Sequence, residues 1–255
     1  MAASLPTIVL VHGAWHTQPN YHNYIEALKA QGFKVLTPHL PSSSGKSPPD
    51  ASFPEDVVAV REVVENLVEA GERVLMVMHS YGGAVGTDAI TGLSFTERKA
   101  EGKKGGVIHL FYMCAYILPP GATIWSIVEE AQMTQFWPQF VDNAADGSSF
   151  PHDPKLLFFG DGVEQRVVDE ALPHLVRSPL SMFHTETKGS AWKIVPATYI
   201  LTQQDYSVPR VYQDIMLSKV KKEGVVLKTE DYETSHSAEM VRAVVEAAKD
   251  ERNPL

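Results

Sequence analysis

Short apolar runs recur along this chain, separated by longer segments in which apolar and polar positions alternate with a helical period. The runs are rich in Val, Ile, Leu and Met and end at small or polar residues, which is typical of strands buried on both faces of a sheet. We therefore expect six strands, at residues 8–11, 33–36, 73–78, 107–113, 198–201 and 225–228.

The intervening segments carry apolar residues three and four positions apart, as on one face of an α-helix. The clearest case spans residues 57–68 and follows Ser52 and Glu55, which have the spacing of a capping box. Residues 20–31 predict another helix, with Asn20 as its N-cap. Further helices are expected at residues 84–90, 211–222 and 237–249.

Strands that alternate with helices predict an α/β fold with a mostly parallel, six-stranded sheet and helices on both faces, because parallel strands need crossover connections. The interval 117–192 is too long to be a loop in a compact domain and is rich in aromatic residues. We therefore expect a core formed by residues 1–116 and 193–255, into which residues 117–192 are inserted as a helical cap with some irregular chain.

Composition and charge narrow the classes of function. The chain has 255 residues, 44% of them hydrophobic, which is enough to bury a large core. A formal net charge of −9 argues against a nucleic-acid partner, since phosphate binding needs clustered Lys and Arg. We interpret the main basic cluster as a solvated loop; it comprises Arg98, Lys99, Lys103 and Lys104.

Cysteine content and the N-terminal residues bear on location. Cys114 is the single cysteine, so the chain cannot form an intrachain disulfide, and we expect a buried structural thiol. Residues 1–6 lack the basic start of a signal peptide, and the run 8–11 is too short to span a membrane. We expect a cytoplasmic protein without a membrane partner, and the sequence leaves the oligomeric state open, a homodimer included.

One strand-to-helix junction carries a serine in an unusual setting. Ser80 follows the expected strand 73–78 and His79 directly, and Gly82 and Gly83 come just after it. Small neighbours let the backbone turn sharply and hold the serine oxygen clear of the sheet at the start of a helix. A plain helix N-cap is the structural alternative for Ser80.

A second turn follows the first expected strand, where His12 and Gly13 precede Ala14 and Trp15. Gly13 lets the backbone approach a neighbouring segment closely. The alternative is an ordinary turn at the end of a strand, with His12 hydrogen-bonded.

Two titratable residues follow the last two expected strands. Asp205 comes just after the fifth strand, and His236 lies in the loop before the last helix. A His and a carboxylate at the ends of parallel strands can supply a general base and the acid that orients it, for a nucleophile such as Ser80. A helix-capping loop is the alternative for the segment around His236, and Asp231 is the alternative acid.

Taken together, these motifs make the chain resemble a capped α/β-hydrolase of the compact group that includes plant methyl-ester esterases, hydroxynitrile lyases and many fungal and bacterial hydrolases of unassigned substrate. The resemblance covers essentially the whole chain. It implies an α/β-hydrolase fold with a catalytic triad of Ser80, Asp205 and His236. It also implies an oxyanion hole formed by the backbone amides of Ala14 and Tyr81.

The resemblance implies hydrolysis of a carboxylic ester, lactone or thioester through an acyl-enzyme on Ser80, without a cofactor. Lyases of the group have Thr in place of Gly13 and Lys in place of Ser237, so both residues favour an esterase. A carbon–carbon lyase of hydroxynitrile or retro-aldol type and a ligand-binding receptor are the alternatives on this fold. Met78 stands where the family usually has Gly, which suggests altered packing beneath the serine.

Aromatic residues predict an apolar pocket for a small to medium apolar or aromatic substrate. Candidate lining residues, beside Tyr81, are Trp15, Trp125, Phe136 and Trp137. We expect no metal site, because the helical spacing and the carboxylates of such sites are missing around the nearest cluster of histidines, His12, His16 and His22.

Overall fold

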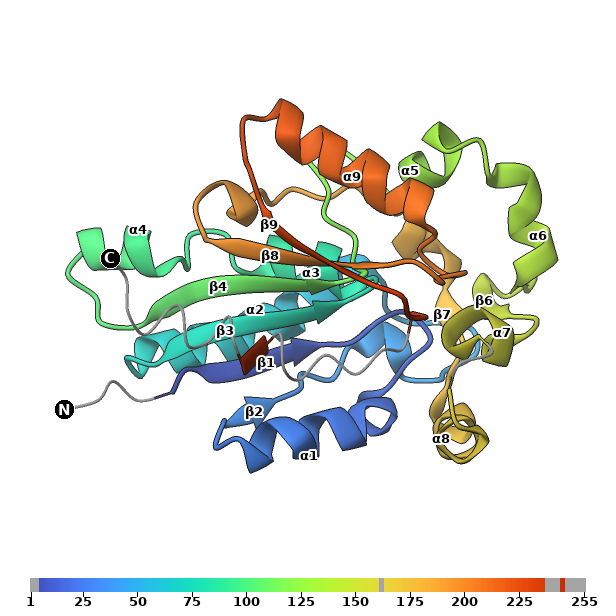
Figure 1. Ribbon diagram of the computed structural model, residues 1–255, viewed down its shortest axis with the longest axis horizontal. Coiled ribbons are helices and arrows are strands. Elements are labelled where there is room, and N and C mark those ends of the chain that lie inside the picture. Colours follow the sequence, from blue (N-terminus) through green and yellow to red (C-terminus); the bar gives the residue numbers. More distant parts are fainter. Residues whose placement is uncertain (1–4, 161–162, 237–243, 246–255) are drawn as a thin grey trace.

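The computed structural model describes residues 5–160, 163–236 and 244–245. Its centre is a six-stranded sheet in the order β2-β1-β3-β4-β8-β9, in which every neighbouring pair is parallel (Figure 1). The strands are β1 (Thr7–Val11), β2 (Val35–Leu36), β3 (Arg73–His79), β4 (Gly106–Met113), β8 (Ala197–Thr202) and β9 (Lys228–Tyr232). The predicted parallel α/β architecture is confirmed.

Helices cover both faces of this sheet, because each strand presents alternate residues to opposite sides. α1 (His22–Ala30) packs through Ile25 and Leu28 on the face that carries Leu10 and Val77. The opposite face is covered by α2 (Phe53–Glu69), α3 (Gly82–Ala89) and α9 (Arg210–Lys222). Each fully buried aliphatic side chain in these layers contributes about 1.5–3 kcal/mol to folding.

β9 starts later than predicted. Residues 225–227 precede the strand, and Val226 is 90% exposed. β9 is the terminal strand of the sheet and consists mainly of exposed or half-buried polar residues. An edge strand of this kind does not need an apolar sequence, so the apolar run at 225–228 was a misleading signal and that prediction is wrong.

The start of the first helix also differs from its prediction. A 3-10 turn, η1 (Gln18–Tyr21), comes before α1, and Tyr21 occupies the N-cap position of α1. The Asn20 side chain instead accepts a hydrogen bond from the Thr17 amide at 2.8 Å and donates one to the Ala171 carbonyl at 2.8 Å. Asn20 is therefore not the N-cap of α1, because its amide group links segments far apart in sequence.

The basic cluster is not a solvated loop throughout. Arg98 lies in α4 (Phe95–Ala100) and is 2% exposed. Its guanidinium donates to the carbonyls of Val68 and Gly105 at 3.0 and 2.7 Å and pairs with Glu69 at 2.9 Å. Arg98 thus satisfies a carbonyl at the C-terminus of α2, where cations are favoured.

The chain between β4 and β8 lies at the carboxyl ends of the sheet strands (Figure 1). Unlike the prediction, it includes a second, antiparallel sheet of three strands, β5 (Val141–Asn143), β6 (Ser148–Pro151) and β7 (Ser178–Pro179). Its helices are α5 (Ile124–Glu130), α6 (Trp137–Phe140), α7 (Pro154–Phe159) and α8 (Gln165–Ala171). We propose that residues 117–192 act as a cap over the strand ends.

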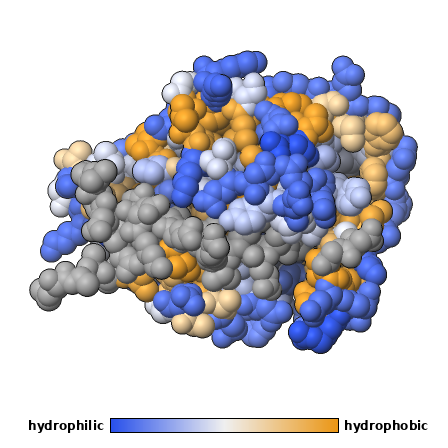
Figure 2. All heavy atoms as spheres, viewed as in Figure 1, coloured by the Kyte–Doolittle hydropathy of each residue, from blue (hydrophilic) through white to orange (hydrophobic). Residues whose placement is uncertain are grey.

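Short 3-10 turns complete the description: η2 (Pro41–Ser43), η3 (Thr134–Phe136), η4 (Leu172–His174), η5 (Leu180–Phe183) and η6 (Ala191–Lys193). The helix predicted at 237–249 lies outside the described residues except for 244 and 245, where Val244 packs on the same face as α1. In the described part of the chain, no helix combines the length and apolar character needed to cross a bilayer. On the face seen in Figure 2, hydrophobic residues form several separate patches among hydrophilic ones.

Candidate active site

The turn between β3 and α3 holds Ser80 in a backbone conformation that residues with a side chain rarely adopt. Its φ is 53°. The Ser80 amide donates to the Met113 carbonyl at 3.2 Å, and its carbonyl accepts from the amides of Gly83 and Tyr116 at 3.0 and 2.9 Å. Such a conformation costs about 1–3 kcal/mol, and these bonds hold it in place. This geometry is typical of a nucleophile elbow.

The two glycines after Ser80 are required by space. A Cβ at Gly82 would lie 2.3 Å from the carbonyl oxygen of Val11, and one at Gly83 would lie 2.6 Å from that of Tyr116. α3 can therefore begin this close to the ends of β1 and β4 only with glycine at both positions.

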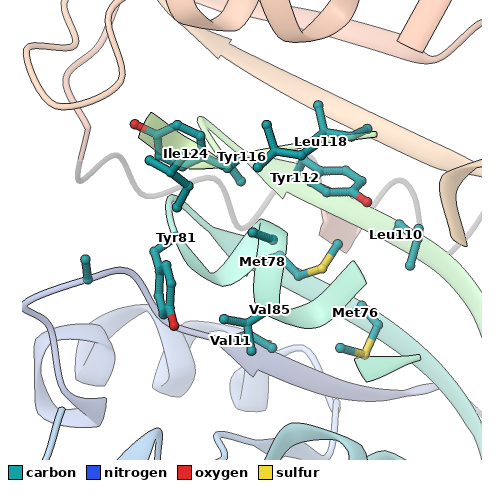
Figure 3. Packing of buried hydrophobic residues seen from close by; sticks show 14 of the residues in the cluster. Val11, Met76, Met78, Tyr81, Val85, Leu110, Tyr112, Tyr116, Leu118 and Ile124 are labelled. Atoms are coloured by element: carbon teal, nitrogen blue, oxygen red, sulfur yellow. The ribbon is translucent and has the colours of Figure 1, made fainter. Parts of the chain in front are cut away.

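Met78, which replaces the family's usual glycine, is fully buried in the layer between α3 and the sheet (Figure 3). Gly86 of α3 provides the space for it, since a Cβ at Gly86 would lie 2.5 Å from the Met78 sulfur. A larger residue beneath the elbow is thus matched by a smaller one in the helix above it.

Asp205 and His236 form a buried hydrogen-bonded pair. The distance between His236 Nδ1 and Asp205 Oδ2 is 2.9 Å, and neither side chain is more than 1% exposed. The Asp205 carboxylate also accepts hydrogen bonds from the Thr202 hydroxyl at 2.8 Å and from the amides of Ser207 and Val208 at 2.9 and 2.7 Å. A carboxylate held by this many donors fixes the orientation of the imidazole ring.

The alternative acid, Asp231, does not take part in this pair. It lies in β9, where it accepts hydrogen bonds from Gln203 and from Arg210, the latter at 3.0 Å. The structure therefore places Asp205, rather than Asp231, beside His236.

The backbone of His236 is tied to the turn that carries Ser80. The His236 carbonyl accepts from His79 Nε2 at 2.8 Å and from the Cys114 thiol at 3.3 Å, and the two imidazole centroids are 4.4 Å apart. Burial lowers the pKa of His79 well below 6.5, helped by the neighbouring His236 and His16, so the His79 ring is neutral. Nε2 of His236 has no hydrogen-bond partner among the described residues, which leaves it available for a proton from a hydroxyl.

The turn after β1 lies against the elbow. A Cβ at Gly13 would be 3.1 Å from Ser80 Cβ and 3.1 Å from His79 Nδ1, so only glycine fits without displacement. The Gly13 amide donates to the Tyr21 hydroxyl at 3.0 Å, and that hydroxyl lies 2.6 Å from His79 Nδ1. Tyr21 therefore connects this turn to the residue that precedes Ser80.

Ala14 and Tyr81 border the same cavity as Ser80. Within the described residues neither N–H donates to a protein acceptor, whereas the next amide, that of Trp15, donates to Ser178 Oγ at 2.9 Å. Two such N–H groups beside a serine are the donors that a developing oxyanion requires.

The side chain of Tyr81 is anchored by a buried carboxylate. Its hydroxyl donates to Asp56 at 2.7 Å, and the same carboxylate accepts from the amide and hydroxyl of Ser42 at 2.9 and 2.5 Å. Burial raises the pKa of Asp56 to about 6, although the bonds from Ser42 and Tyr81 oppose the shift. Burial and the nearby Asp56 raise the pKa of Tyr81 well above 10, so the phenol remains a donor.

A narrow cavity opens at Ser80, with about 60 Å³ of space for the centre of a water molecule. Four predicted lining residues border it: Trp15, Tyr81, Phe136 and Trp137. Trp125 does not; it packs edge-on against Trp137 with 5.4 Å between ring centroids. α9 and the loop before it add lining residues that the sequence analysis did not propose, Tyr206, Ser207, Pro209 and Tyr212.

Metal-ligating side chains come together at one point of the described chain, where ligand atoms of His79, Cys114 and His236 lie within 4.8 Å of one another. Hydrogen bonds to the His236 carbonyl explain this grouping. Burial raises the pKa of Cys114 well above 9, so the residue is a thiol and not the thiolate that binds metals. No comparable group in the described residues contains the histidines considered above, His12, His16 and His22.

The sequence profile of the alpha/beta hydrolase family matches residues 8–247 of this chain. The chain belongs to the alpha/beta hydrolase family. Membership supports a hydrolase activity in the broad sense and agrees with the parallel sheet and the elbow described above.

Individual proteins are similar to this chain over about half of its length or more. Alpha/beta hydrolase nvfD of Aspergillus novofumigatus (strain IBT 16806) is 29% identical over 211 residues, which are 82% of this chain and 81% of nvfD. The carbendazim hydrolyzing esterase of Nocardioides sp. (strain SG-4G) is 30% identical over 139 residues, 54% of this chain and 53% of the esterase. The crystal structure of the methylesterase MES16 from Arabidopsis has the same fold, with a TM-score of 0.72 at 19% identity over 96% of this chain and 99% of that one.

Several site residues of this alpha/beta hydrolase were missed from the sequence. Asp56 could have been recognised as a buried residue, because it stands four residues before Val60 on the apolar face of α2. A charged group on such a face needs a buried partner. No sequence pattern identifies Tyr21 and Tyr116 as site residues, because buried tyrosines are common in protein cores. Only the fold brings these two close to Ser80.

Proposed function

We propose that this alpha/beta hydrolase is a serine carboxylic-ester hydrolase with Ser80 as nucleophile. The observation that carries the proposal is the pairing of a serine at φ 53° with a buried His236–Asp205 pair attached to the same turn. A serine alone is a weak nucleophile, and an adjacent oriented imidazole is what activates it.

The proposed reaction has two stages. Ser80 Oγ attacks the ester carbonyl carbon while His236 Nε2 takes the hydroxyl proton, and the bond to the alcohol oxygen then breaks as His236 returns the proton to that oxygen. Water next attacks the acyl-enzyme, giving its proton to His236, which passes it to Ser80 as the carboxylic acid leaves. Asp205 holds the Nδ1 proton of His236 throughout and stabilises the imidazolium that forms.

Backbone donors supply the remaining stabilisation. We propose that the amides of Ala14 and Tyr81 bind the carbonyl oxygen as it gains negative charge, which is worth about 10²–10³ in rate for each donor in related hydrolases. The Asp56 bond to the Tyr81 side chain supports this role, because it restrains the residue that carries one of the two amides.

The lining of the cavity favours an apolar or aromatic acyl or alcohol group in an ester, lactone or thioester of small to medium size. Trp15, Trp137 and Phe183 present ring surfaces to it. The relative from Nocardioides is named as an esterase, which supports the same class of reaction.

Labelling with a fluorophosphonate probe, followed by mass spectrometry of the peptide that contains Ser80, tests this function. We expect one adduct on Ser80 in the wild type, none in Ser80→Ala, and labelling slowed about 10⁴-fold in His236→Ala. Ser207→Ala is the matched control, since Ser207 lines the same cavity without a proposed role, and it should label normally.

A wild type that stays unlabelled while a control hydrolase reacts would contradict the nucleophile assignment. Turnover of a cyanohydrin or a β-hydroxy carbonyl compound with no ester hydrolysis would replace the proposal with a lyase reaction. A slow single turnover that leaves a stably bound product would point to a receptor.

A further inference from the structure

Two tyrosines in the cavity wall differ from the other buried tyrosines of this protein. Five buried tyrosines direct their hydroxyls to protein partners: Tyr21, Tyr24, Tyr81, Tyr112 and Tyr199. Tyr116 and Tyr212 are 6% and 7% exposed, and the described residues offer neither hydroxyl a hydrogen-bond partner. Buried polar groups are nearly always paired, so two unpaired phenols that share one cavity call for a partner outside the protein.

Neither hydroxyl is sealed inside the protein. The fully enclosed polar side-chain atoms without a partner in the described chain are His16 Nε2, Ser235 Oγ and His236 Nε2. Tyr116 and Tyr212 both line the cavity at Ser80, and neither hydroxyl is among those enclosed atoms.

Both tyrosines are positioned by the catalytic elements themselves. The Tyr116 amide donates to the Ser80 carbonyl at 2.9 Å. Tyr212 lies in the first turn of α9, and the loop before α9 is held by Asp205 through the amides of Ser207 and Val208. Their hydroxyls therefore stand at a set place relative to the nucleophile.

Both hydroxyls act as donors at neutral pH. Burial, with a contribution from Tyr212, raises the pKa of Tyr116 well above 10, and burial raises the pKa of Tyr212 to about 12. A phenol that keeps its proton offers an O–H to an acceptor oxygen.

Three other lining residues present rings without free polar groups. Trp15 Nε1 donates to the carbonyl of Ser149 at 3.1 Å, and Trp137 Nε1 donates to Asn143 at 3.2 Å. Phe183 packs against both indoles, with 5.3 Å between ring centroids in each case. The lining of the cavity therefore combines a cluster of three aromatic rings with two tyrosines whose hydroxyls have no partner among the described residues.

We propose that the substrate is an oxygenated ester. Besides the scissile carbonyl it carries a second acceptor oxygen, in a ketone, ether or hydroxyl group, which receives hydrogen bonds from Tyr116 and Tyr212 while its apolar part lies on the rings of Trp15, Trp137 and Phe183. This inference rests on the proposed ester hydrolysis and names the class of ester.

The test measures hydrolysis of two series of esters. In the first, para-nitrophenyl hexanoate is compared with para-nitrophenyl esters that carry a ketone at successive positions of the acyl chain. In the second, hexyl acetate is compared with acetates that carry the ketone in the alcohol. The wild type should hydrolyse at least one keto ester with kcat/KM about tenfold above its hydrocarbon partner, the effect of two hydrogen bonds of ordinary net strength. Tyr116→Phe, Tyr212→Phe and the double variant keep the rings and should lose this preference through a higher KM for the keto esters.

Tyr206→Phe is the matched control, because Tyr206 lines the same cavity but is 52% exposed and its hydroxyl can bind water. It should keep the wild-type preference. Equal kcat/KM for keto and hydrocarbon esters in the wild type, or an unchanged preference in the double variant, would overturn the inference while ester hydrolysis itself stands.

Failure of the proposed function gives a different result. If the wild type hydrolyses no ester and Ser80 is not labelled, calorimetric binding of the keto esters and their hydrocarbon partners decides the inference instead. Tighter binding of a keto ester that is lost in the double variant supports it, and equal binding in both proteins contradicts it.

Discussion

Asp205 uses both oxygens of its carboxylate. One lies 2.9 Å from His236 Nδ1 and accepts from Thr202, and the other accepts the amides of Ser207 and Val208. The same side chain therefore orients His236, the proposed general base, and holds the loop that leads to α9.

Replacing Asp205 by Asn tests the first of these roles. The amide oxygen of Asn can still accept the two loop amides, but its NH₂ group then faces His236 Nδ1 and stabilises the tautomer with the proton on Nε2. We expect kcat for a para-nitrophenyl ester to fall about 10⁴-fold. The circular dichroism spectrum should remain that of the wild type.

Asp231→Asn is the matched control for this prediction. Asp231 makes an ion pair with Arg210 on an exposed strand and should affect neither kcat nor KM. A larger loss of activity in Asp231→Asn than in Asp205→Asn would show that the acid has been assigned to the wrong residue.

At the scale of elements, Tyr21 links three of them. It stands at the start of α1, and its hydroxyl bonds the Gly13 amide after β1 and His79 at the end of β3. His79 in turn donates to the carbonyl of His236. The turn after β1, the elbow and the loop that carries His236 are thus joined by one chain of hydrogen bonds.

Tyr21→Phe should break this chain without changing the volume of the core. It leaves a buried amide and a ring nitrogen unpaired, which should lower the free energy of unfolding by about 1–3 kcal/mol. Because the Gly13 turn is then less well placed, kcat should fall about 10- to 100-fold. Urea denaturation and ester hydrolysis measure the two effects.

Tyr112→Phe separates stability from activity. Tyr112 is equally buried, but its hydroxyl bonds Thr87 in α3 rather than the site. We expect a similar loss of stability with kcat retained. Equal losses of kcat in the two variants would mean that Tyr21 acts only through global stability.

The elements that the sequence predicts well are those whose residues are buried from both sides. β3 and β4 follow their apolar runs closely because strands between two layers of helices are buried on both faces and are therefore mainly apolar. A search for apolar runs does not find β9, because β9 is a polar edge strand. The hydrogen-bond partners of Arg98 and Asn20 lie far away in sequence, so no local pattern predicts them.

The candidate site likewise contains residues that a local sequence pattern predicts and residues that only the folded structure identifies. Ser80, Asp205 and His236 follow strand ends, and the order of strands in a parallel sheet brings such positions together. Tyr116 and Tyr212 could not be found this way, because their proposed role depends on hydroxyls that have no partner among the described residues, and only the packed structure reveals this.

At the scale of the whole molecule, three buried histidines link stability to pH. Burial lowers the pKa of His12 to about 4 and of His16 to about 3, and it lowers that of His79 well below 6.5. Between pH 6.5 and about 4 the unfolded chain therefore binds more protons at these positions than the folded protein does. The free energy of unfolding should fall as the pH falls, by up to about 1.4 kcal/mol per pH unit for each histidine.

Asp56 acts in the opposite direction, because its pKa is raised to about 6 and the folded state takes up a proton there first. Three histidines outweigh one carboxyl, so we expect net destabilisation on acidification. Urea denaturation at pH 7.5 and pH 5.5 measures it. An unfolding free energy that stays level or rises on going to pH 5.5 would show that the buried histidines are already protonated in the folded protein.

The polar sequence of β9 has a consequence for self-association. Lys228, Glu230 and Asp231 lie along the terminal strand of the sheet, where another copy of the chain would otherwise find unpaired backbone groups. A twofold axis at that edge would set copies of the same charged strand against each other, with like charges opposite one another at its centre. The polar residues that set β9 apart from the apolar strands of the sheet thus also disfavour growth of the sheet from one molecule into the next.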